Sequence, residues 1–239
     1  MKGVILAGGT GTRLYPLTKV INKHLLPVGK VPMICHGIEK FKQAGIEEIL
    51  IVIGKQSAGL YIDLLGSGKE WGVSVTFKIQ EEAGGIAQAL YLAEPFITPS
   101  EKFIVLLGDN LFEDHLTTFV QSFEQQAAGA RVLLKKVHDP KRYGVPVLEK
   151  DSIVMIEEKP EEPKSEYCVT GIYMYDSTVF ETIRTIKPSA RGELEITDVN
   201  NVYASKGQLN YDILDGWWTD AGTFQSLYQA SGLSSGIQC

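Results

Sequence analysis

The sequence has few of the features that mark secreted, membrane-spanning or metal-cluster proteins. It contains three cysteines in 239 residues, an odd number without CxxC spacing, which argues against a disulfide framework and predicts reduced thiols. Its apolar runs fall short of the roughly 20 residues that cross a bilayer, and the run at the N-terminus is too short for a signal peptide. We therefore expect a soluble, cytoplasmic protein without a membrane partner.

Positive charge is also scarce. Lys and Arg number 23 against 29 Asp and Glu, which gives a formal net charge of −6. Because binding to a phosphate backbone depends on surplus Lys and Arg, we expect no nucleic-acid partner. A small phosphorylated substrate remains compatible, since a few well-placed cations suffice for it. The four histidines show no metal-binding spacing and are assigned no role: His24, His36, His115 and His138.

The first 110 residues alternate short apolar runs with helix-like segments. Strands are predicted at residues 2–7, 49–53, 73–79 and 103–107, and helices at 32–44, 58–65 and 86–92. This order favours an α/β fold with a Rossmann-like, mostly parallel central sheet and helices on both faces. Ligands of such sheets bind beyond the carboxyl ends of the strands, so the residues after 7 and after 107 are candidate walls of a site.

The second half is more mixed. Strands or extended segments are predicted at residues 131–137, 153–156, 169–175, 209–214 and 217–219, and helices at 177–186, 196–206 and 224–230. No internal repeat, low-complexity tract or long linker interrupts the chain. We therefore predict one domain over residues 1–239, with two lobes that share a sheet.

The strongest motif follows the first strand. Residues 6–13 read LAGGTGTR, and Lys23 comes shortly after them. A glycine-rich turn after a strand lets backbone N–H groups approach phosphate oxygens, and nearby cations stabilise the charge that develops during phosphoryl transfer. A glycine pair alone is more often only a tight turn. The pattern is not a P-loop, because no G-x-x-x-x-G-K-[ST] occurs. It is not a Rossmann fingerprint either, because Leu14 stands where the last glycine would be.

Together with this motif, several blocks resemble the family of sugar-nucleotide pyrophosphorylases. Its signature is similar to GGTGTRL followed by a lysine before LLPV, and further matching blocks lie at residues 108–110, 157–160, 169–173, 190–200 and 218–223. The resemblance spans residue 1 to about residue 225. It is strongest to the thymidylyltransferases that act on glucose 1-phosphate in bacterial rhamnose-type pathways, which serve polysaccharide biosynthesis.

The resemblance implies a GT-A-like nucleotidyltransferase fold and a homo-oligomer. It places a nucleotide-binding half at about residues 1–110 and a sugar-phosphate-binding half at about 111–225, before a short tail. The implied nucleotide-binding residues are Leu6, Gly8, Gly9, Gly11, Thr12, Arg13, Lys23, Gln80, Gly85 and Asp109. The implied sugar-phosphate-binding residues are Asn110, Tyr143, Gly144, Glu158, Lys159, Val169 and Thr170. Arg13, Lys23 and Lys159 are the implied catalytic residues.

Mg²⁺ is the implied cofactor, with Asp109 and Asp220 as its ligands. A carboxylate at the end of an apolar strand suits this hard cation, which usually takes one or two protein carboxylates and completes its shell with phosphates and water. Without the resemblance, each aspartate could equally well cap a turn instead of binding a metal. The charged loop at residues 157–164 would then be better explained as a solvated surface loop than as a binding site.

The expected activity is Mg²⁺-dependent in-line transfer of a nucleotidyl group from dTTP to α-D-glucose 1-phosphate, which gives dTDP-glucose and pyrophosphate. One alternative is a uridylyltransferase of the same family, because residues 83–86 read AGGI where many thymidylyltransferases carry Pro-Asp-Gly. Another is a regulatory module that keeps the fold without catalysis. The presence of every charged site residue favours the enzyme.

Overall fold

The computed structural model describes residues 1–233, which form two compact units. The N-terminal unit comprises Lys2–Ala83, Leu106–Thr117 and the chain from Gly216 onward. The inserted unit comprises Gly84–Val105 and Thr118–Asp215. Three separate stretches of sequence therefore build the first unit. Within the described part of the chain, no helix combines the length and the hydropathy needed to cross a membrane.

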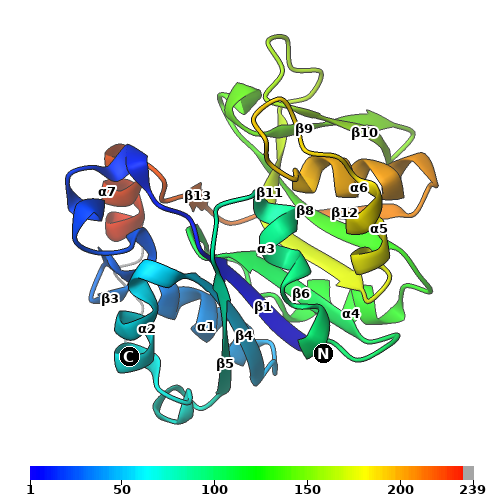
Figure 1. Cartoon of the computed structure of the whole chain (residues 1–239). Coiled ribbons are helices and arrows are strands. Elements are labelled where there is room, and N and C mark those ends of the chain that lie inside the picture. Colours follow the sequence, from blue (N-terminus) through cyan, green and yellow to red (C-terminus); the bar gives the residue numbers. More distant parts are fainter. Residues whose placement is uncertain (234–239) are drawn as a thin grey trace. The chain divides into compact units, whose positions relative to one another are not determined.

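A seven-stranded sheet has the strand order β12-β8-β11-β6-β1-β4-β5 (Figure 1). The strands are β1 (Lys2–Ala7), β4 (Glu48–Gly54), β5 (Ser74–Gln80), β6 (Lys102–Leu107), β8 (Ala130–Lys136), β11 (Tyr167–Asp176) and β12 (Leu209–Ile213). β1 pairs in parallel with β4, β4 with β5, and β12 with β8, whereas β11 runs antiparallel to β8. The predicted α/β class with a mostly parallel sheet is confirmed.

In the N-terminal unit, the sheet core follows from continuous apolar runs. Almost every residue of β1 and β4 is buried, as expected for parallel strands that are covered on both faces. Helix α1 (Met33–Gln43) packs closely on β1 and β6, because a Cβ on Gly3 of β1 would overlap the ring of Phe41 and a Cβ on Gly37 would overlap Leu106 of β6. Glycine at these two positions lets the helix and the sheet approach each other.

The other elements of the N-terminal unit are α2 (Ala58–Leu65), the two-residue strands β2 (Pro27–Val28) and β3 (Val31–Pro32), β7 (Asn110–Phe112), β13 (Trp218–Asp220) and α7 (Phe224–Leu233). Ala230 of α7 and Ala221 belong to one buried apolar cluster with Val28, Met33 and Leu111. The last described helix is thus part of the core of the unit that contains the N-terminus.

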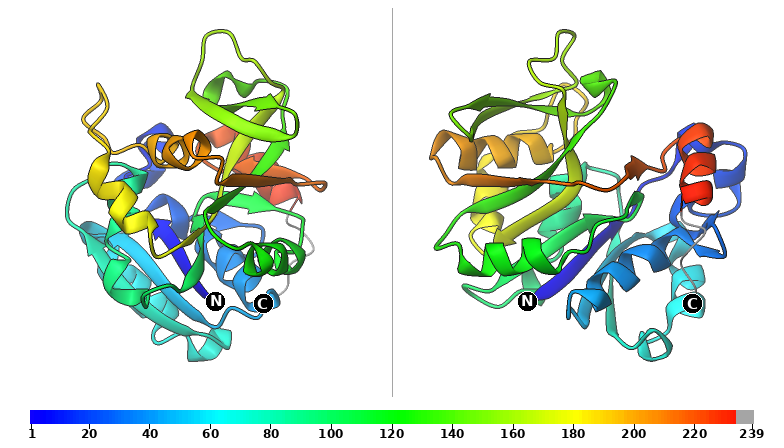
Figure 2. Two further views of the ribbon diagram at one scale, coloured as in Figure 1. Left: turned by 90° about the vertical axis from the view of Figure 1, so that its right-hand side faces the viewer. Right: turned by 180° about the vertical axis from the view of Figure 1, so that it is seen from behind.

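The remaining elements are α3 (Ile86–Tyr91), α4 (Thr117–Gln125), β9 (Gly144–Glu149), β10 (Ser152–Glu158), α5 (Val179–Thr185) and α6 (Ile196–Ser205). In the inserted unit, β9 and β10 form an antiparallel hairpin with α6 alongside it (Figure 2). Asn201 of α6 accepts a hydrogen bond from Ile156 N at 2.7 Å and donates one to Ile156 O at 2.9 Å. These two bonds fix α6 against the hairpin.

The predicted elements agree with the structure within two residues at each end, except that α7 extends to Leu233. Strand β1 and helix α2 have the predicted bounds. Sequence reasoning did not predict α4, β7 or β9. Strand β9 contains Pro146, which is rare in strand interiors, and α4 begins with two β-branched threonines.

The boundaries of the two units differ from the predicted division near residue 110. The chain from Gly216 onward returns to the N-terminal unit, although the sequence assigned residues 111–225 to one half. The assignment of nucleotide and sugar phosphate to the two halves remains a prediction.

The contact between α1 and β1 yields a stability prediction. Because Phe41 is fully buried against Gly3, Phe41→Ala is expected to lower the free energy of unfolding by about 3–5 kcal/mol. Urea unfolding followed by circular dichroism measures the change. The exposed Gln43→Ala on the same helix is the control and should stay within about 0.5 kcal/mol of the parent. Equal effects of the two substitutions would contradict this packing.

Candidate active site

The glycine-rich turn after β1 is covered by two long side chains. Gly11 has a φ of 67°, a left-handed conformation that glycine adopts without strain. A Cβ on Gly11 would lie 3.0 Å from Lys23 Cβ, and one on Gly9 would lie 3.6 Å from Lys23 Cε. A Cβ on Gly8 would overlap the side-chain oxygen of Gln80. Larger residues in the turn would therefore displace Lys23 and Gln80.

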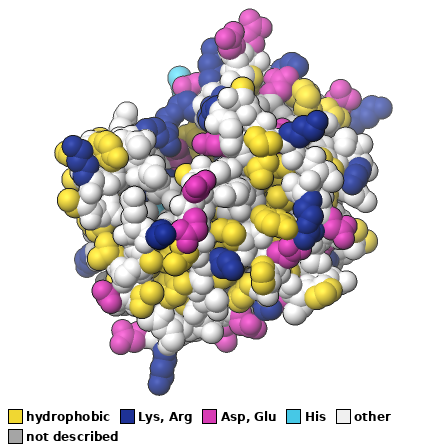
Figure 3. Space-filling model, in the orientation of Figure 1, with side chains coloured by type: hydrophobic (Ala, Val, Ile, Leu, Met, Phe, Trp, Pro, Cys, Tyr) yellow, Lys and Arg dark blue, Asp and Glu magenta, His cyan; other side chains and the backbone are white. Residues whose placement is uncertain are grey.

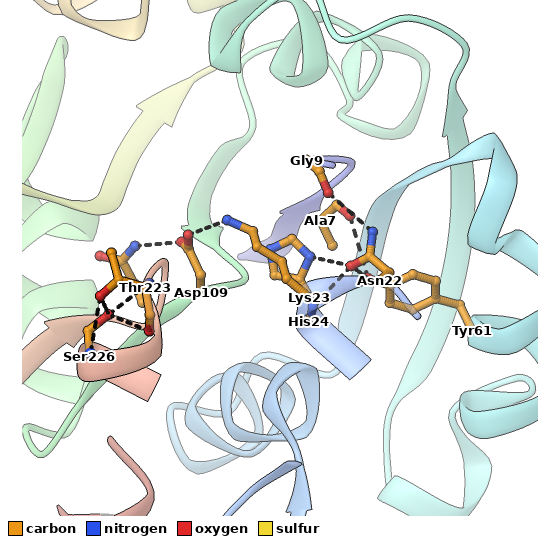
Figure 4. A network of polar contacts seen from close by, with 10 residues as sticks. Ala7, Gly9, Asn22, Lys23, His24, Tyr61, Asp109, Thr223 and Ser226 are labelled. Atoms are coloured by element: carbon orange, nitrogen blue, oxygen red, sulfur yellow. Dashed lines mark hydrogen bonds and ion pairs between the residues drawn. The ribbon is translucent and has the colours of Figure 1, made fainter. Parts of the chain in front are cut away.

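Lys23 reaches across the turn to Asp109. Its Nζ lies 2.5 Å from Asp109 Oδ2, and the two side chains are only 13% and 12% exposed (Figure 4). Burial by itself raises the pKa of Asp109, but the charge of Lys23 and its hydrogen bond outweigh this and hold the pKa well below its usual range. The aspartate is therefore ionised at neutral pH despite its burial.

The carboxylate of Asp109 is oriented by its neighbour. Asn110 Nδ2 donates to Asp109 Oδ1 at 3.1 Å, and Asn110 Oδ1 accepts a hydrogen bond from Trp218 Nε1 at 2.8 Å. Asn110 is buried, so its amide links the indole to the aspartate. The predicted contact of Asn110 with the sugar phosphate stays a prediction.

Asp220 lies beside this arrangement because β13 pairs antiparallel with β7. Asp220 is opposite Asn110 in the register, and Ala221 N donates to Asp109 O at 2.8 Å. Asp109, in the turn before β7, and Asp220, at the end of β13, are thus brought together in the N-terminal unit although they are distant in the sequence.

Arg13 completes the cluster. Its Nη2 would lie 2.8 Å from a Cβ on Gly222, and Asp220 Oδ2 would lie 3.4 Å from the same position. The guanidinium group therefore occupies the space that a side chain at Gly222 would fill, next to the Asp220 carboxylate. The structure brings Arg13, Lys23, Asp109 and Asp220 together at the glycine turn.

Two further predicted residues support the turn. The carbonyl of buried Leu6 accepts a hydrogen bond from Gly108 N at 3.0 Å, which ties the end of β1 to the residue before Asp109. Thr12 begins the short 3₁₀ helix Thr12–Leu14, which carries Arg13.

Sequence reasoning missed Asn22, whose side chain is a centre of hydrogen bonding. Asn22 Nδ2 donates to Gly9 O at 3.2 Å. Asn22 Oδ1 accepts from His24 N at 3.0 Å, from His24 Nδ1 at 2.8 Å and from Tyr61 OH at 2.9 Å. The available signal was the preference of Asn for the N-cap, since Asn22 caps the 3₁₀ helix Lys23–Leu25.

His24 was assigned no role but belongs to this network. Burial, and next the charge of Lys23, lower the pKa of His24 from 6.5 to about 3. The ring is therefore neutral at physiological pH. Because its Nδ1 lies against the oxygen of Asn22, Nδ1 is the nitrogen that carries the proton.

A second cluster of predicted residues lies in the inserted unit. Glu158 is opposite Gly144 in the hairpin and accepts a hydrogen bond from Thr197 Oγ1 at 2.7 Å. Lys159 Nζ lies 3.0 Å from Glu158 Oε1, and Lys159 N donates to Tyr143 O at 3.0 Å. Lys159 has a φ of 49°, which is uncommon for a residue with a side chain and is a frequent mark of functional sites.

Two residues of this cluster were not predicted. Thr197 hydrogen-bonds Glu158, and Arg191 Nη2 lies 3.9 Å from Glu158 Oε1 and 2.9 Å from Glu195 Oε1. They belong to the block at residues 190–200, whose resemblance to the family was noted without any assignment of roles.

The Gly84–Gly85 turn is fixed within the inserted unit. Gly85 has a φ of 102°, and a Cβ there would overlap the carbonyl of Leu194. Leu194 N donates to Gly84 O at 2.8 Å, and Ala87 N donates to Leu194 O at 3.1 Å. This position therefore requires glycine. Its predicted partner at the base, Gln80, belongs to the N-terminal unit.

Val169 and Thr170 lie on β11 where its pairing with β8 is irregular. Thr170 is buried, and its Oγ1 donates to Leu133 O at 2.8 Å, so the hydroxyl proton is already hydrogen-bonded within the sheet. Val169 is partly exposed. Their predicted contact with the sugar remains a prediction.

The carboxylates of Asp109 and Asp220 are candidate ligands of a divalent ion. Among residues 1–233, no group of three or more His, Cys, Asp or Glu side chains is arranged to hold a metal. Asp109 and Asp220 form a two-carboxylate set, which fits an ion such as Mg²⁺ that takes its other ligands from substrate and water. The Lys23 ammonium already shows that a cation is accommodated at Asp109.

Acidic and basic side chains are interspersed over the face of the molecule in Figure 3. This face shows no broad basic field.

Comparison with known proteins identifies relatives. Residues 2–234 match the family model described as nucleotidyl transferase. A glucose-1-phosphate thymidylyltransferase of Neisseria meningitidis is 42% identical over 244 residues, which is 100% of this chain and 84% of the relative. One of Xanthomonas campestris is 43% identical over 241 residues, covering 99% of this chain and 81% of the relative.

Two solved structures are also similar to this chain. A Bacillus anthracis protein, provisionally described as a glucose-1-phosphate thymidylyltransferase and crystallised with sucrose, is 56% identical with a TM-score of 0.96, covering 100% of this chain and 97% of that one. A UDP-glucose pyrophosphorylase in complex with UDP-glucose is 27% identical with a TM-score of 0.85, covering 97% of each chain.

The buried, neutral His24 predicts a loss of stability in acid. With a pKa of about 3 when folded and about 6.5 when unfolded, the unfolded state binds more protons between these values, so lowering the pH favours unfolding. Between pH 7 and pH 5 the metal-free protein should lose about 2 kcal/mol through this residue. Urea unfolding at both pH values, compared between the parent and His24→Gln, measures it. An unchanged pH dependence in the variant would refute the assignment.

Proposed function

Because this chain belongs to the nucleotidyl transferase family, we propose that it transfers a thymidylyl group from dTTP to α-D-glucose 1-phosphate, giving dTDP-glucose and pyrophosphate. The observation that carries the proposal is the meeting of Arg13, Lys23, Asp109 and Asp220 at a glycine-rich turn. The names of the relatives from Neisseria meningitidis and Xanthomonas campestris supply the nucleotide and the sugar.

The reaction is an in-line displacement at phosphorus. A phosphate oxygen of glucose 1-phosphate bonds to the α-phosphorus of dTTP while the bond from that phosphorus to the bridging oxygen breaks, and pyrophosphate leaves with the electron pair. The attacking oxygen is already anionic, so no base is required. Two like charges 4 Å apart repel by about 4 kcal/mol at an effective dielectric of 20, so catalysis consists mainly of neutralising and positioning two anions.

The residues of the N-terminal unit would hold the nucleotide. Backbone N–H groups of the glycine turn and Arg13 bind the triphosphate, and Lys23 leaves Asp109 to stabilise charge at the α-phosphate. Leu6 and Thr12 support this turn, and Gln80 offers a donor and an acceptor to the base. Gly85 of the inserted unit is a further proposed nucleotide contact, through its backbone.

The residues of the inserted unit would hold the sugar phosphate. Glu158 accepts hydrogen bonds from sugar hydroxyls, and the half-exposed Lys159 binds the phosphate. The Thr197 hydroxyl orients the Glu158 carboxylate, and the absence of a side chain at Gly144 leaves space beside it, which supports this role. The other proposed contacts come from Asn110, Tyr143, Val169 and Thr170.

The proposed cofactor is Mg²⁺, with Asp109 and Asp220 as its ligands. The adjacency of the backbone at Asp109 and Asp220 supports this choice. When bound, the ion supplies positive charge against the phosphates of the nucleotide. Lys23 must then exchange its partner, because it is the cation that neutralises Asp109 in this structure.

We also propose a cytoplasmic location and a homo-oligomeric state. Cys35 and Cys168 are buried thiols that form no disulfide within the described chain, which agrees with a reducing compartment. The third cysteine, Cys239, lies outside the described residues. Apolar side chains such as Val20 and Tyr228 are more than 80% exposed on the N-terminal unit, which agrees with contact between copies.

Pyrophosphate release measured over a matrix of triphosphates and sugar phosphates tests the proposed function. The pair dTTP and glucose 1-phosphate should react fastest, and EDTA should abolish the reaction because the carboxylates then lack their ion. A faster reaction with UTP would favour the uridylyltransferase, which the likeness to the UDP-glucose pyrophosphorylase keeps under consideration. Release with no pair would favour the non-catalytic module.

Lys23→Ala and Asp109→Ala test the roles at the turn. Each should lower kcat by orders of magnitude, about 10²–10³-fold. Lys23→Ala removes a positive charge that would act on the reacting phosphates, and Asp109→Ala removes a proposed ligand of the ion. The same pyrophosphate assay at saturating substrates measures this. Lys30→Ala, which removes an exposed lysine between β2 and β3, is the control and should keep the parent rate. Near-normal turnover in either test variant would show that the roles are wrong.

A further inference from the structure

The side chain of Asn22 connects three parts of the N-terminal unit. Its amide nitrogen contacts the glycine turn through Gly9 O, and its oxygen accepts hydrogen bonds from the 3₁₀ helix of Lys23 and from Tyr61 of α2 (Figure 4). Asn22 is 9% exposed and Tyr61 is fully buried. The contacts are therefore shielded from water, and each fixes the amide more firmly than an exposed hydrogen bond does.

The orientation of the Asn22 amide is set by its partners. Two of these partners have fixed roles, because the backbone His24 N can only donate and the backbone Gly9 O can only accept. A flipped amide would place its NH₂ group against His24 N and leave Gly9 O without its hydrogen bond. Nδ2 is therefore held toward the glycine turn, and the oxygen faces His24 Nδ1 and Tyr61 OH.

Holding the carbonyl of Gly9 also orients the next amide. In a trans peptide, the C=O of one residue and the N–H of the next point in opposite directions, so the Thr10 N–H points away from Asn22. Thr18 Oγ1 donates to Gly11 O at 2.7 Å and orients the Thr12 N–H in the same way. Among residues 1–233, neither N–H donates to another residue, so both remain available to an anion.

The same side chain fixes the start of the helix that carries Lys23. As the N-cap residue, Asn22 holds His24 N, and Lys23 is the residue between them. Lys23 then lies along Gly9 and Gly11. One amide therefore sets the spacing between the N–H donors of the turn and the Lys23 ammonium.

We propose that Asn22 is a positioning residue for nucleotidyl transfer, which holds the phosphate-binding N–H groups and Lys23 at a fixed spacing. The proposal rests on the proposed function. A triphosphate bound by the turn presents its α-phosphorus to Lys23 only while that spacing is kept. An error of about 1 Å in such an alignment costs roughly 100-fold in rate.

The test compares Asn22→Ala and Asn22→Ser with Tyr61→Phe. Serine keeps a capping oxygen for His24 N but cannot reach Gly9 O. The serine variant therefore still provides the test if the alanine variant does not fold. Tyr61→Phe removes one hydrogen bond to the same oxygen and the longer contact of 3.5 Å to Ala7 O at the end of β1, but it keeps the bond from Asn22 to Gly9 O. We expect kcat to fall roughly 30- to 100-fold in both Asn22 variants. Tyr61→Phe should lose much less kcat, in a comparison between variants that have the same melting temperature.

A double-substitution cycle with Lys23→Ala separates positioning from general stability. If Asn22 acts by aligning Lys23, Asn22→Ser should cost less than about fivefold in kcat once Lys23 is gone. Independent effects, in which the two losses multiply, would overturn the proposal. So would an Asn22→Ser variant with kcat within about twofold of the parent.

Amide signals of the turn give a readout without catalysis. NMR line shapes and relaxation of the Thr10 and Thr12 amides should report disorder in Asn22→Ser and not in Tyr61→Phe. If the parent protein releases no pyrophosphate, the proposed function fails by itself, and these signals still decide whether Asn22 orders the turn. An unchanged turn in Asn22→Ser would refute the inference even in an active enzyme.

Discussion

The ion pair between Lys23 and Asp109 is the interaction on which the candidate site depends. The partners lie 86 residues apart in sequence and meet at 2.5 Å with little exposure to solvent. Removing either partner would leave an unpaired buried charge, which is far more costly than losing a pair at the surface. The pair therefore joins the glycine turn to the end of β6. It also keeps the Asp109 carboxylate and the Lys23 ammonium ionised side by side.

Each member of the pair is aligned by an adjacent asparagine. Asn22 precedes Lys23 and bonds the turn along which the lysine lies, while Asn110 follows Asp109 and bonds both its carboxylate and the Trp218 indole. Neutral amides suit this work, because they donate and accept at once without adding charge to a site that must receive a polyanion. The inserted unit has an analogous arrangement, in which the Thr197 hydroxyl orients Glu158.

Local patterns in the sequence predicted most of the fold, because buried parallel strands and amphipathic helices leave strong periodic signals. The bounds of β1 and α2 follow directly from apolar runs that end at glycines. The meeting of Asp109 and Asp220 depends on the pairing of β7 with β13, which no local pattern encodes, so only the resemblance to a family suggested it. Asn22 was missed for the same reason: its partners at Gly9, His24 and Tyr61 are adjacent only after folding. The buried hydroxyl of Thr170 likewise depends on an irregularity in strand pairing.

The return of the chain to the N-terminal unit at Gly216 has a consequence for biosynthesis. Lys23 and Asp109 leave the ribosome early, whereas β13, which carries Asp220, is among the last strands to be made. A nascent or prematurely terminated polypeptide that ends before Gly216 has one carboxylate at the turn and lacks the strand that completes β7. Translation products that end before Gly216 therefore cannot assemble the two-carboxylate site, and the competence of the N-terminal unit is tied to synthesis of the chain as far as Asp220.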